Sequence, residues 1–280
     1  MTYHHVGLRD DSPDDIQHRQ LLIQAMVNVV SNGGYQPVVT PVVESYDQRH
    51  EVLGAHFHEC IRLNHHGTSR RVLRSDHTIS IARMVTSRLA DRPSVRLYYC
   101  DPVFRYDTAH GETDIIQFGV EHIGHLTIDD ELDMIQMVQA CCQAVGVVDA
   151  AIHLGHPALF QSCTPDQHRR LQDGDMTHCA TLPRQYRPHD TPETAPFYAI
   201  ARALTARSID SVFINDGLYK DLSYYNGIYF DVVSPSFGKI IGSGGRYDAV
   251  LKAYGSSQHA IGFSLNIHHV EGALVSCQPS

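Results

Sequence analysis

An arginine and two polar side chains fall on neighbouring apolar segments, and together they could bind a small charged molecule. In residues 114–121 the side chains alternate between two faces, so Gln117 and Glu121 share one face of a predicted strand. Arg105 lies on the preceding predicted strand, and a hairpin would bring its guanidinium toward both. Such a set suits a zwitterion with a basic side chain. The alternative is a buried Arg–Glu ion pair that only joins two strands.

Two other patterns could carry chemistry, but each is incomplete. His56, His58 and Cys60 would share one face of a strand, as zinc ligands can, yet the chain offers no second ligand pair with convincing spacing. Gly242-Ser243-Gly244-Gly245 lacks the lysine and the following helix of a phosphate-binding P-loop. We therefore expect no metal and no cofactor, and we expect close backbone packing beside a pocket at the glycines.

Length, cysteine content and charge limit the classes of function. A chain of 280 residues can bury a large core, and its seven cysteines match neither a disulfide framework nor a zinc ribbon. No apolar run approaches the roughly 20 residues that span a bilayer, and the N-terminus lacks a signal-peptide pattern. A formal charge of -9 argues against a broad nucleic-acid surface. These features predict a cytoplasmic protein with no membrane partner and no tRNA partner.

The first element that must position the polar residues is a helix over about residues 12–31. Ser12-Pro13-Asp14-Asp15 has the capping hydroxyl, the proline and the acids of a helix start, and Asn32-Gly33-Gly34 is typical of a helix end. Its predicted apolar stripe consists of Leu21, Leu22, Ala25, Met26, Val29 and Val30. The next segment, 36–44, is β-branched but carries two prolines, which confine it to a sheet edge or to an irregular extended crossing at a subunit interface.

The remaining chain alternates strands and helices. The predicted helices are 76–90, 128–145 and 249–254, and the predicted strands are 98–106, 114–124, 147–154 and 224–233. The polar stretch at about 161–195 is interpreted as a small insertion or a long surface excursion. The order predicts one α+β domain over residues 1–280, in which helices flank an antiparallel sheet.

Ordered motifs along the chain resemble the catalytic core of class II aminoacyl-tRNA synthetases, specifically histidyl-tRNA synthetase and its paralogue, the regulatory subunit of short-form ATP phosphoribosyltransferase. The matching segments are 34–44 (motif 1), 73–78, 103–124 (motif 2), 220–225, 244–248 and 260–263 (the start of motif 3). The resemblance covers most of the chain. It implies a six-stranded antiparallel sheet flanked by helices, a homodimer formed through motif 1, and a histidine pocket on the sheet.

The resemblance also implies which residues bind histidine. The ligand's amino group would contact Asp76, Thr78 and Gln117, its carboxylate Arg105, and its imidazole Glu121 and Tyr224. Tyr225 completes the predicted set, and because neighbouring strand residues point to opposite faces, only one of the two tyrosines should touch the ligand. Asp76 and Lys220 stand where the family usually has glutamate and arginine.

Departures from the family pattern predict that amino-acid activation is lost. Adenylate formation needs cations around the nucleotide phosphates. The loop 107–114 has three acids and no lysine or arginine, and His269 stands where motif 3 has arginine. Lys220 replaces the arginine thought to assist attack on the α-phosphate. With its end at Ser280, the chain would also lack the anticodon-binding domain of a histidyl-tRNA synthetase.

The resemblance therefore implies a non-catalytic regulatory subunit of short-form ATP phosphoribosyltransferase in histidine biosynthesis. Such a protein joins a short catalytic subunit in a hetero-octamer, raises its activity and mediates feedback inhibition by histidine. The alternative is a stand-alone amino-acid-activating ligase related to histidyl-tRNA synthetase. It would use the same fold with altered phosphate contacts and would show histidine-dependent exchange between ATP and pyrophosphate.

Overall fold

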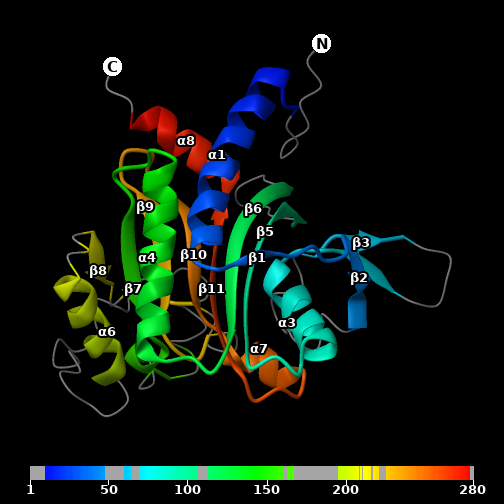
Figure 1. The fold of residues 1–280 in the computed structure, drawn as a ribbon, viewed down its shortest axis with the longest axis vertical. Coiled ribbons are helices and arrows are strands. Elements are labelled where there is room, and N and C mark those ends of the chain that lie inside the picture. Colours follow the sequence, from blue (N-terminus) through cyan, green and yellow to red (C-terminus); the bar gives the residue numbers. More distant parts are fainter. Residues whose placement is uncertain are drawn as a thin grey trace.

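A large mixed sheet forms the centre of the molecule (Figure 1). The computed structural model describes residues 10–47, 60–64, 70–105, 113–160, 163–164, 166, 195–207, 209, 211–215, 217–220 and 225–277. In spatial order the strands are β1 (Gln36–Pro37), β5 (Ser94–Phe104), β6 (Asp114–Gly124), β11 (His259–Asn266), β10 (Lys239–Arg246), β9 (Tyr229–Ser234), β7 (Ala151–Gly155) and β8 (Val212–Ile214). The six strands from β5 to β7 pair antiparallel, while β1 and β8 add a parallel strand at each edge. The predicted α+β class with an antiparallel sheet is confirmed.

Helices cover the two faces of this sheet unequally. The larger group comprises α1 (Pro13–Asn32), α4 (Ile128–Ala144), α6 (Ala195–Ala206) and α8 (Ile267–Ser276). It shares the main hydrophobic core with Phe118 and Val120 of β6. On the other face, α3 (His77–Arg88) and α7 (Asp248–Ala253) build a smaller core with Tyr99 and Ile123. Because residues alternate along β6, Gln117 and Glu121 lie on the face of α3 and α7.

A second, three-stranded sheet lies beside the large one (Figure 1). It has the order β2 (Val43–Ser45), β4 (Arg71–Leu73), β3 (Arg62–Leu63). A 3-10 helix, η2 (Pro157–Phe160), follows β7. Both predicted alternatives hold in part for segment 36–44: β1 and β2 are terminal strands of their sheets, and residues 38–42 between them are in no strand.

The predicted first helix is confirmed, but its buried face differs in part from the predicted stripe. Ser12 and Asp15 form a reciprocal capping box. Leu22, Met26 and Val30 are buried, whereas Leu21 is 66% exposed, so its assignment to the core was wrong. Arg19 takes the inward position one turn earlier, where it binds Asp11 and Glu271 and ties the helix to α8.

Several element limits differ from the predictions. The strand predicted at 147–154 begins only at Ala151, because the chain turns at residues 145–146, where Gly146 has a φ of 90°, and again at residues 148–149. The aromatic strand begins at Tyr229 rather than at 224. Helices α6 and α8 were not predicted. The glycines of β10 do pack closely, since a Cβ on Gly244 would stand 2.5 Å from the Gly262 carbonyl oxygen. Most of the stretch 161–195 lies outside the described residues, as do His56 and His58.

Within the described part of the chain, no helix combines the length and apolar character that crossing a membrane requires.

Candidate functional site

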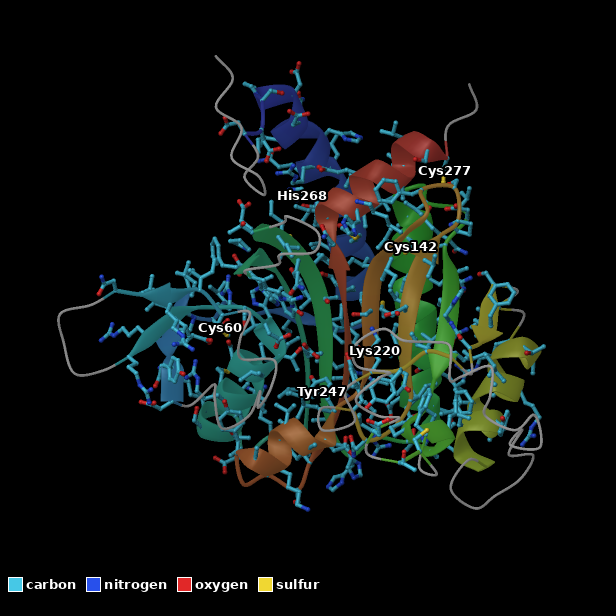
Figure 2. The ribbon with its side chains drawn as sticks, turned by 180° about the vertical axis from the view of Figure 1, so that it is seen from behind. Cys60, Cys142, Lys220, Tyr247, His268 and Cys277 are labelled. Atoms are coloured by element: carbon cyan, nitrogen blue, oxygen red, sulfur yellow. The ribbon has the colours of Figure 1, made fainter. Side chains whose placement is uncertain are left out.

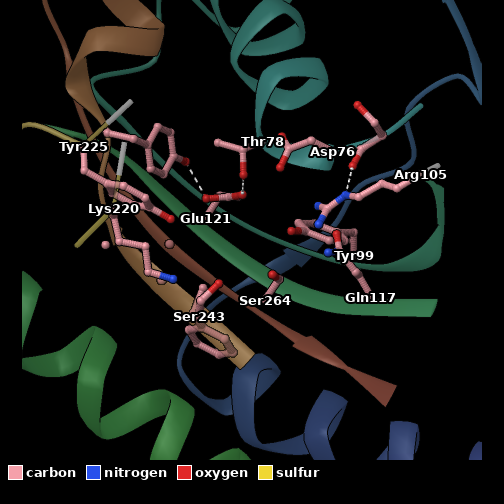
Figure 3. A pocket seen from close by; sticks show the side chains of 16 residues that line it. Asp76, Thr78, Tyr99, Arg105, Gln117, Glu121, Lys220, Tyr225, Ser243 and Ser264 are labelled. Atoms are coloured by element: carbon pink, nitrogen blue, oxygen red, sulfur yellow. Dashed lines mark hydrogen bonds between the residues drawn. The ribbon is translucent and has the colours of Figure 1, made fainter. Parts of the chain in front are cut away.

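A cavity of about 320 Å³ opens on the face of the large sheet that carries Gln117 and Glu121. Six of the seven predicted histidine-binding residues line it, namely Asp76, Thr78, Arg105, Gln117, Glu121 and Tyr225. Tyr224 lies outside the described residues. Arg105 and Gln117 lie toward one end of the cavity, and Glu121 and Tyr225 toward the other (Figure 3). The tertiary structure thus brings these six residues together from four separate stretches of the sequence.

Glu121 forms the floor of the cavity and is 1% exposed. Thr78 donates its hydroxyl to Oε1 at 2.7 Å, and Tyr247 donates its hydroxyl to Oε2. The carboxyl group lies against the main chain of β11, because a Cβ on Gly262 would stand 1.9 Å from Oε2. Burial raises the pKa of Glu121 to about 8, although the two hydroxyl donors oppose that rise. Burial therefore favours the neutral carboxylic acid over the carboxylate at this position.

Arg105 reaches the cavity through the predicted hairpin, since β5 and β6 pair antiparallel and Arg105 lines the cavity with Gln117 and Glu121. It lies just beyond β5, whose last residue, Phe104, pairs with Asp114. Its Nε donates to the Ser75 carbonyl oxygen at 2.7 Å, and its main chain bridges to Cys60. The guanidinium is thus held by a main-chain oxygen, while Glu121 is held by hydroxyls. The alternative of an Arg105–Glu121 ion pair is wrong.

The start of α3 supplies Asp76 and Thr78 together. Asp76 is the N-cap, and its Oδ1 accepts a hydrogen bond from the Ile79 amide at 3.1 Å. Between them, His77 stacks on Tyr99 with ring centroids 4.1 Å apart. This helix start therefore fixes two polar side chains of the site relative to one of its aromatic walls.

Further residues outside the predicted histidine-binding set line the cavity, among them Tyr99, Tyr247, Ser243 and Ser264. Tyr99 lies over Gly119, where a Cβ would stand 2.2 Å from the ring. A glycine between Gln117 and Glu121 on the same strand face was thus a signal for close approach by another side chain. Figure 2, which views the molecule from behind, shows Tyr247 beside α7 and Lys220 on the same side of the sheet. Nothing in the spacing of Ser243 and Ser264, paired between β10 and β11, predicted their place here.

The cations of the cavity already have oxygen partners. Among the described lining residues these cations are Arg105 and Lys220. Lys220 binds Oδ1 of Asp231, a carboxylate that is 4% exposed. His269, at the motif 3 position, lies outside the cavity lining on α8, where its Nδ1 bonds to the Ile240 carbonyl oxygen at 2.7 Å.

In the segment Arg246-Tyr247-Asp248, one residue lines the cavity and the other two stabilise the fold. Tyr247 enters the cavity, whereas Arg246 binds Glu131 of α4 at 2.7 Å and Asp248 at 2.9 Å. Asp248 is the first residue of α7. Two of the three residues are thus structural.

Comparisons with known proteins agree with the fold and with the motif order. A sequence model described as histidyl-tRNA synthetase matches residues 7–173 and 190–270. Among similar proteins, the ATP phosphoribosyltransferase regulatory subunit of Geobacillus sp. (strain WCH70) is 26% identical over 96% of this chain and 80% of its own length. The regulatory subunit of Gloeobacter violaceus is 28% identical over 96% of this chain and 77% of its own length. The histidine–tRNA ligase of Pyrobaculum neutrophilum is 25% identical over 96% of this chain and 75% of its own length.

Solved structures share the same architecture. A regulatory subunit/histidyl-tRNA synthetase from Bacillus halodurans superposes with a TM-score of 0.84 at 24% identity, covering 98% of this chain and 83% of that one. The apo histidyl-tRNA synthetase of S. aureus gives a TM-score of 0.74 at 21% identity, with 99% and 71% covered. The class II synthetase-like fold predicted from the motifs is confirmed.

Proposed function

The chain belongs to the histidyl-tRNA synthetase family, and from this premise we propose that it is a non-catalytic regulatory subunit of short-form ATP phosphoribosyltransferase. In that role it raises the activity of the catalytic subunit and mediates feedback inhibition by histidine. One observation carries the proposal: the cavity brings together the residues predicted to bind an amino acid, while Lys220, the one cation besides Arg105 among its described lining residues, is bound to Asp231. Relatives named as regulatory subunits support the same role.

The shape of the cavity supports histidine as its ligand. Arg105 would bind the ligand carboxylate, and Asp76 with Gln117 would bind the amino group. The imidazole would then extend toward Glu121 and Tyr225 at the other end (Figure 3). An imidazole ring can accept or donate a hydrogen bond, which fits a carboxyl group that changes its protonation near neutral pH.

The electrostatics support loss of amino-acid activation. A triphosphate in the cavity would need cations that are free to contact it. Arg105 would be taken up by the ligand carboxylate, Lys220 is paired with Asp231, and His269 is bonded to the main chain away from the cavity. Residues 106–112 lie outside the described structure and contribute no lysine or arginine. On this reading tRNA is not a partner.

The proposed function includes assembly of this chain into a homodimer and of that dimer with catalytic subunits. Homodimerisation through the motif 1 region is supported by exposed apolar side chains there, with Val39 81%, Val42 42% and Val43 41% exposed. The dimer would combine with short catalytic subunits into a hetero-octamer, as the family resemblance implies.

The decisive experiment titrates this chain into a short-form catalytic subunit from the same genome and follows formation of phosphoribosyl-ATP. We expect a saturable rise in rate that histidine reverses. A flat titration in which no complex forms would refute the proposed role.

The rival function is a stand-alone amino-acid ligase, and the similar identity to histidine–tRNA ligases favours it as the second candidate. It predicts histidine-dependent ATP–pyrophosphate exchange. Exchange that Arg105→Ala abolishes would establish the ligase and exclude the non-catalytic role. We expect none above background.

A further inference from the structure

A serine, a histidine and an aspartate contact one another in that order on the large sheet. Ser94 Oγ lies 3.0 Å from Nε2 of His122, and Nδ1 of His122 lies 3.5 Å from Oδ1 of Asp130. Ser94 and His122 come from the paired strands β5 and β6, and Asp130 comes from α4. Because side chains alternate along β6, His122 and the cavity residue Glu121 point to opposite faces of the sheet. The three groups therefore form a cluster separate from the cavity described above.

The aspartate of this cluster is held in one orientation and is charged. Oδ2 of Asp130 accepts hydrogen bonds from the amide and the hydroxyl of Thr127, each 2.8 Å long, so Oδ1 faces His122. Burial acts to raise the pKa of Asp130, but these hydrogen bonds, with His122 and Arg96 nearby, hold it below its ordinary value. A carboxylate beside Nδ1 favours the imidazole tautomer that carries its hydrogen there. Nε2 is then the acceptor for the Ser94 hydroxyl.

The histidine is buried, and its ring is neutral at neutral pH, as a general base must be. His122 is only 5% exposed. Burial lowers its pKa below the ordinary value, and Arg96 of β5 acts in the same direction, while Asp130 and Asp133 of α4 oppose the shift. A neutral imidazole fixed between a hydroxyl and a carboxylate can accept the serine proton when that serine attacks an electrophile.

The serine, in contrast, is accessible to small molecules. Ser94 is exposed and lies three residues before Leu97, the first residue of β5 that pairs with β1. It lines a cavity of about 480 Å³. His122 and Asp130 line a second cavity of about 340 Å³, and Arg96 lines both. A cation shared by the two cavities favours a substrate that carries a negative charge.

We propose that Ser94 is a nucleophile activated by His122, and that this second site hydrolyses small, negatively charged carboxylic esters. Ser94 Oγ attacks the ester carbonyl carbon and gives its proton to Nε2 of His122, which passes it to the departing alcohol. Water then attacks the acyl group on Ser94, its proton returns through His122 to Oγ, and the carboxylic acid leaves. One water is consumed for each ester, and Asp130 acts as the positioning residue for the imidazole.

A fluorophosphonate tests the nucleophile, because an activated serine displaces its fluoride and keeps the phosphonyl group. Peptide mass spectrometry of wild-type protein should show Ser94 labelled about a hundredfold faster than Ser87, an exposed serine of α3 whose hydroxyl donates to main-chain oxygens. His122→Gln should slow the labelling of Ser94 by a similar factor. Equal rates at the two serines would show that Ser94 only satisfies a buried imidazole, and would overturn the proposal. This comparison uses wild-type protein and does not depend on the folding of a variant.

Turnover is measured with the anionic ester 4-acetoxy-3-nitrobenzoate, with neutral 4-nitrophenyl acetate for comparison. We expect saturable hydrolysis whose kcat/KM rises with pH through a pKa below 6.5, because His122 must be neutral to act as the base. Ser94→Ala should abolish this hydrolysis, and the matched control Ser87→Ala should retain it. Arg96→Gln should raise KM for the anionic ester more than for the neutral one.

The second site is independent of the proposed regulatory function, so the two can fail separately. Ser94→Ala should leave histidine binding within about twofold of wild type, because Ser94 and Glu121 serve opposite faces of the sheet. Ester hydrolysis that persists unchanged in Ser94→Ala would overturn the second site and leave the regulatory role in place. Failure to activate a catalytic subunit would refute that role without touching Ser94.

Discussion

Glu121 is a buried carboxylic acid whose partners are the hydroxyls of Thr78 and Tyr247, and this setting links its ionisation to stability. Because burial raises its pKa to about 8 in the folded protein, the folded state holds the proton more tightly than the unfolded state does. That advantage is complete below about pH 4.5, shrinks as pH rises, and is gone above about pH 8.

We therefore predict that Glu121→Gln flattens the pH dependence of stability. Glutamine stays neutral and can still meet the two hydroxyls, which can donate or accept. Between about pH 4.5 and 8, the unfolding free energy of wild-type protein should fall relative to that of the variant by roughly 1.4 kcal/mol for each pH unit. Urea unfolding at pH 5, 7 and 9 measures this difference. A constant difference across the three values would contradict the buried-acid assignment.

A second residue-scale prediction concerns the glycine against which Glu121 lies. Gly262→Ala would place a Cβ 1.9 Å from Oε2 of Glu121, so the carboxyl group must move out of its place. We expect destabilisation of about 1–3 kcal/mol and loss of histidine binding. Calorimetry with histidine measures the second effect. Gly238→Ala is the control: its Cβ meets no atom within 4 Å, its positive φ of 70° adds a backbone strain that Gly262 lacks, and it should still bind histidine normally.

At the scale of elements, the Asp149 carboxylate links the end of β9, the turn before β10 and the end of α8. Asp149 follows α4 and accepts hydrogen bonds from Ser234 at the end of β9, from Ser236 in the turn before β10, and from Cys277 at the C-cap of α8. These donors hold the pKa of Asp149 below its ordinary value, against the opposing effect of burial. The stabilisation is present above the unfolded pKa of about 3.9 and is lost as pH falls below it.

Asp149→Asn should therefore destabilise the protein at pH 7 by about 1–2 kcal/mol, because a charged acceptor of several bonds becomes a neutral one. The difference between wild type and variant should narrow as pH falls below about 4. Thermal unfolding of both proteins across this range gives the measurement. A difference that widens on acidification would show that the carboxylate does not carry these bonds.

The elements themselves were predictable where local chemistry decides them. The Ser12 cap, the alternation of β6 and the Asp76 cap each depend on neighbours in sequence, and β6 begins and ends where predicted. Helix α8 was missed, although Asn266 is a sound N-cap that accepts from the amides of His268 and His269. It follows β11 without a break, so the preceding apolar strand pattern concealed its start.

At the scale of the whole molecule, the helices on one face bury two neighbouring thiols in the main core. Cys141 and Cys142 of α4 are both 0% exposed, and burial raises the pKa of Cys142 to about 12. A thiol reagent needs both access and a thiolate.

We predict that neither Cys141 nor Cys142 is alkylated in native protein at pH 8, whereas both are alkylated in urea. Peptide mass spectrometry after brief labelling with iodoacetamide distinguishes them from partly exposed Cys277, which serves as the positive control. Rapid native labelling of Cys142 would mean that α4 separates from the sheet.

The sequence alone determined the class of fold, the order of its motifs, the face of β6 that carries Gln117 and Glu121, and the shortage of cations near the site. These properties follow from side-chain type and from the period of two along a strand. Only the tertiary structure decided that Tyr247 reaches Glu121 across 126 residues, that Lys220 is bound to Asp231, and that the main chain of Arg105 bridges to Cys60. Such contacts depend on strand order and register across the whole sheet, which local spacing does not specify.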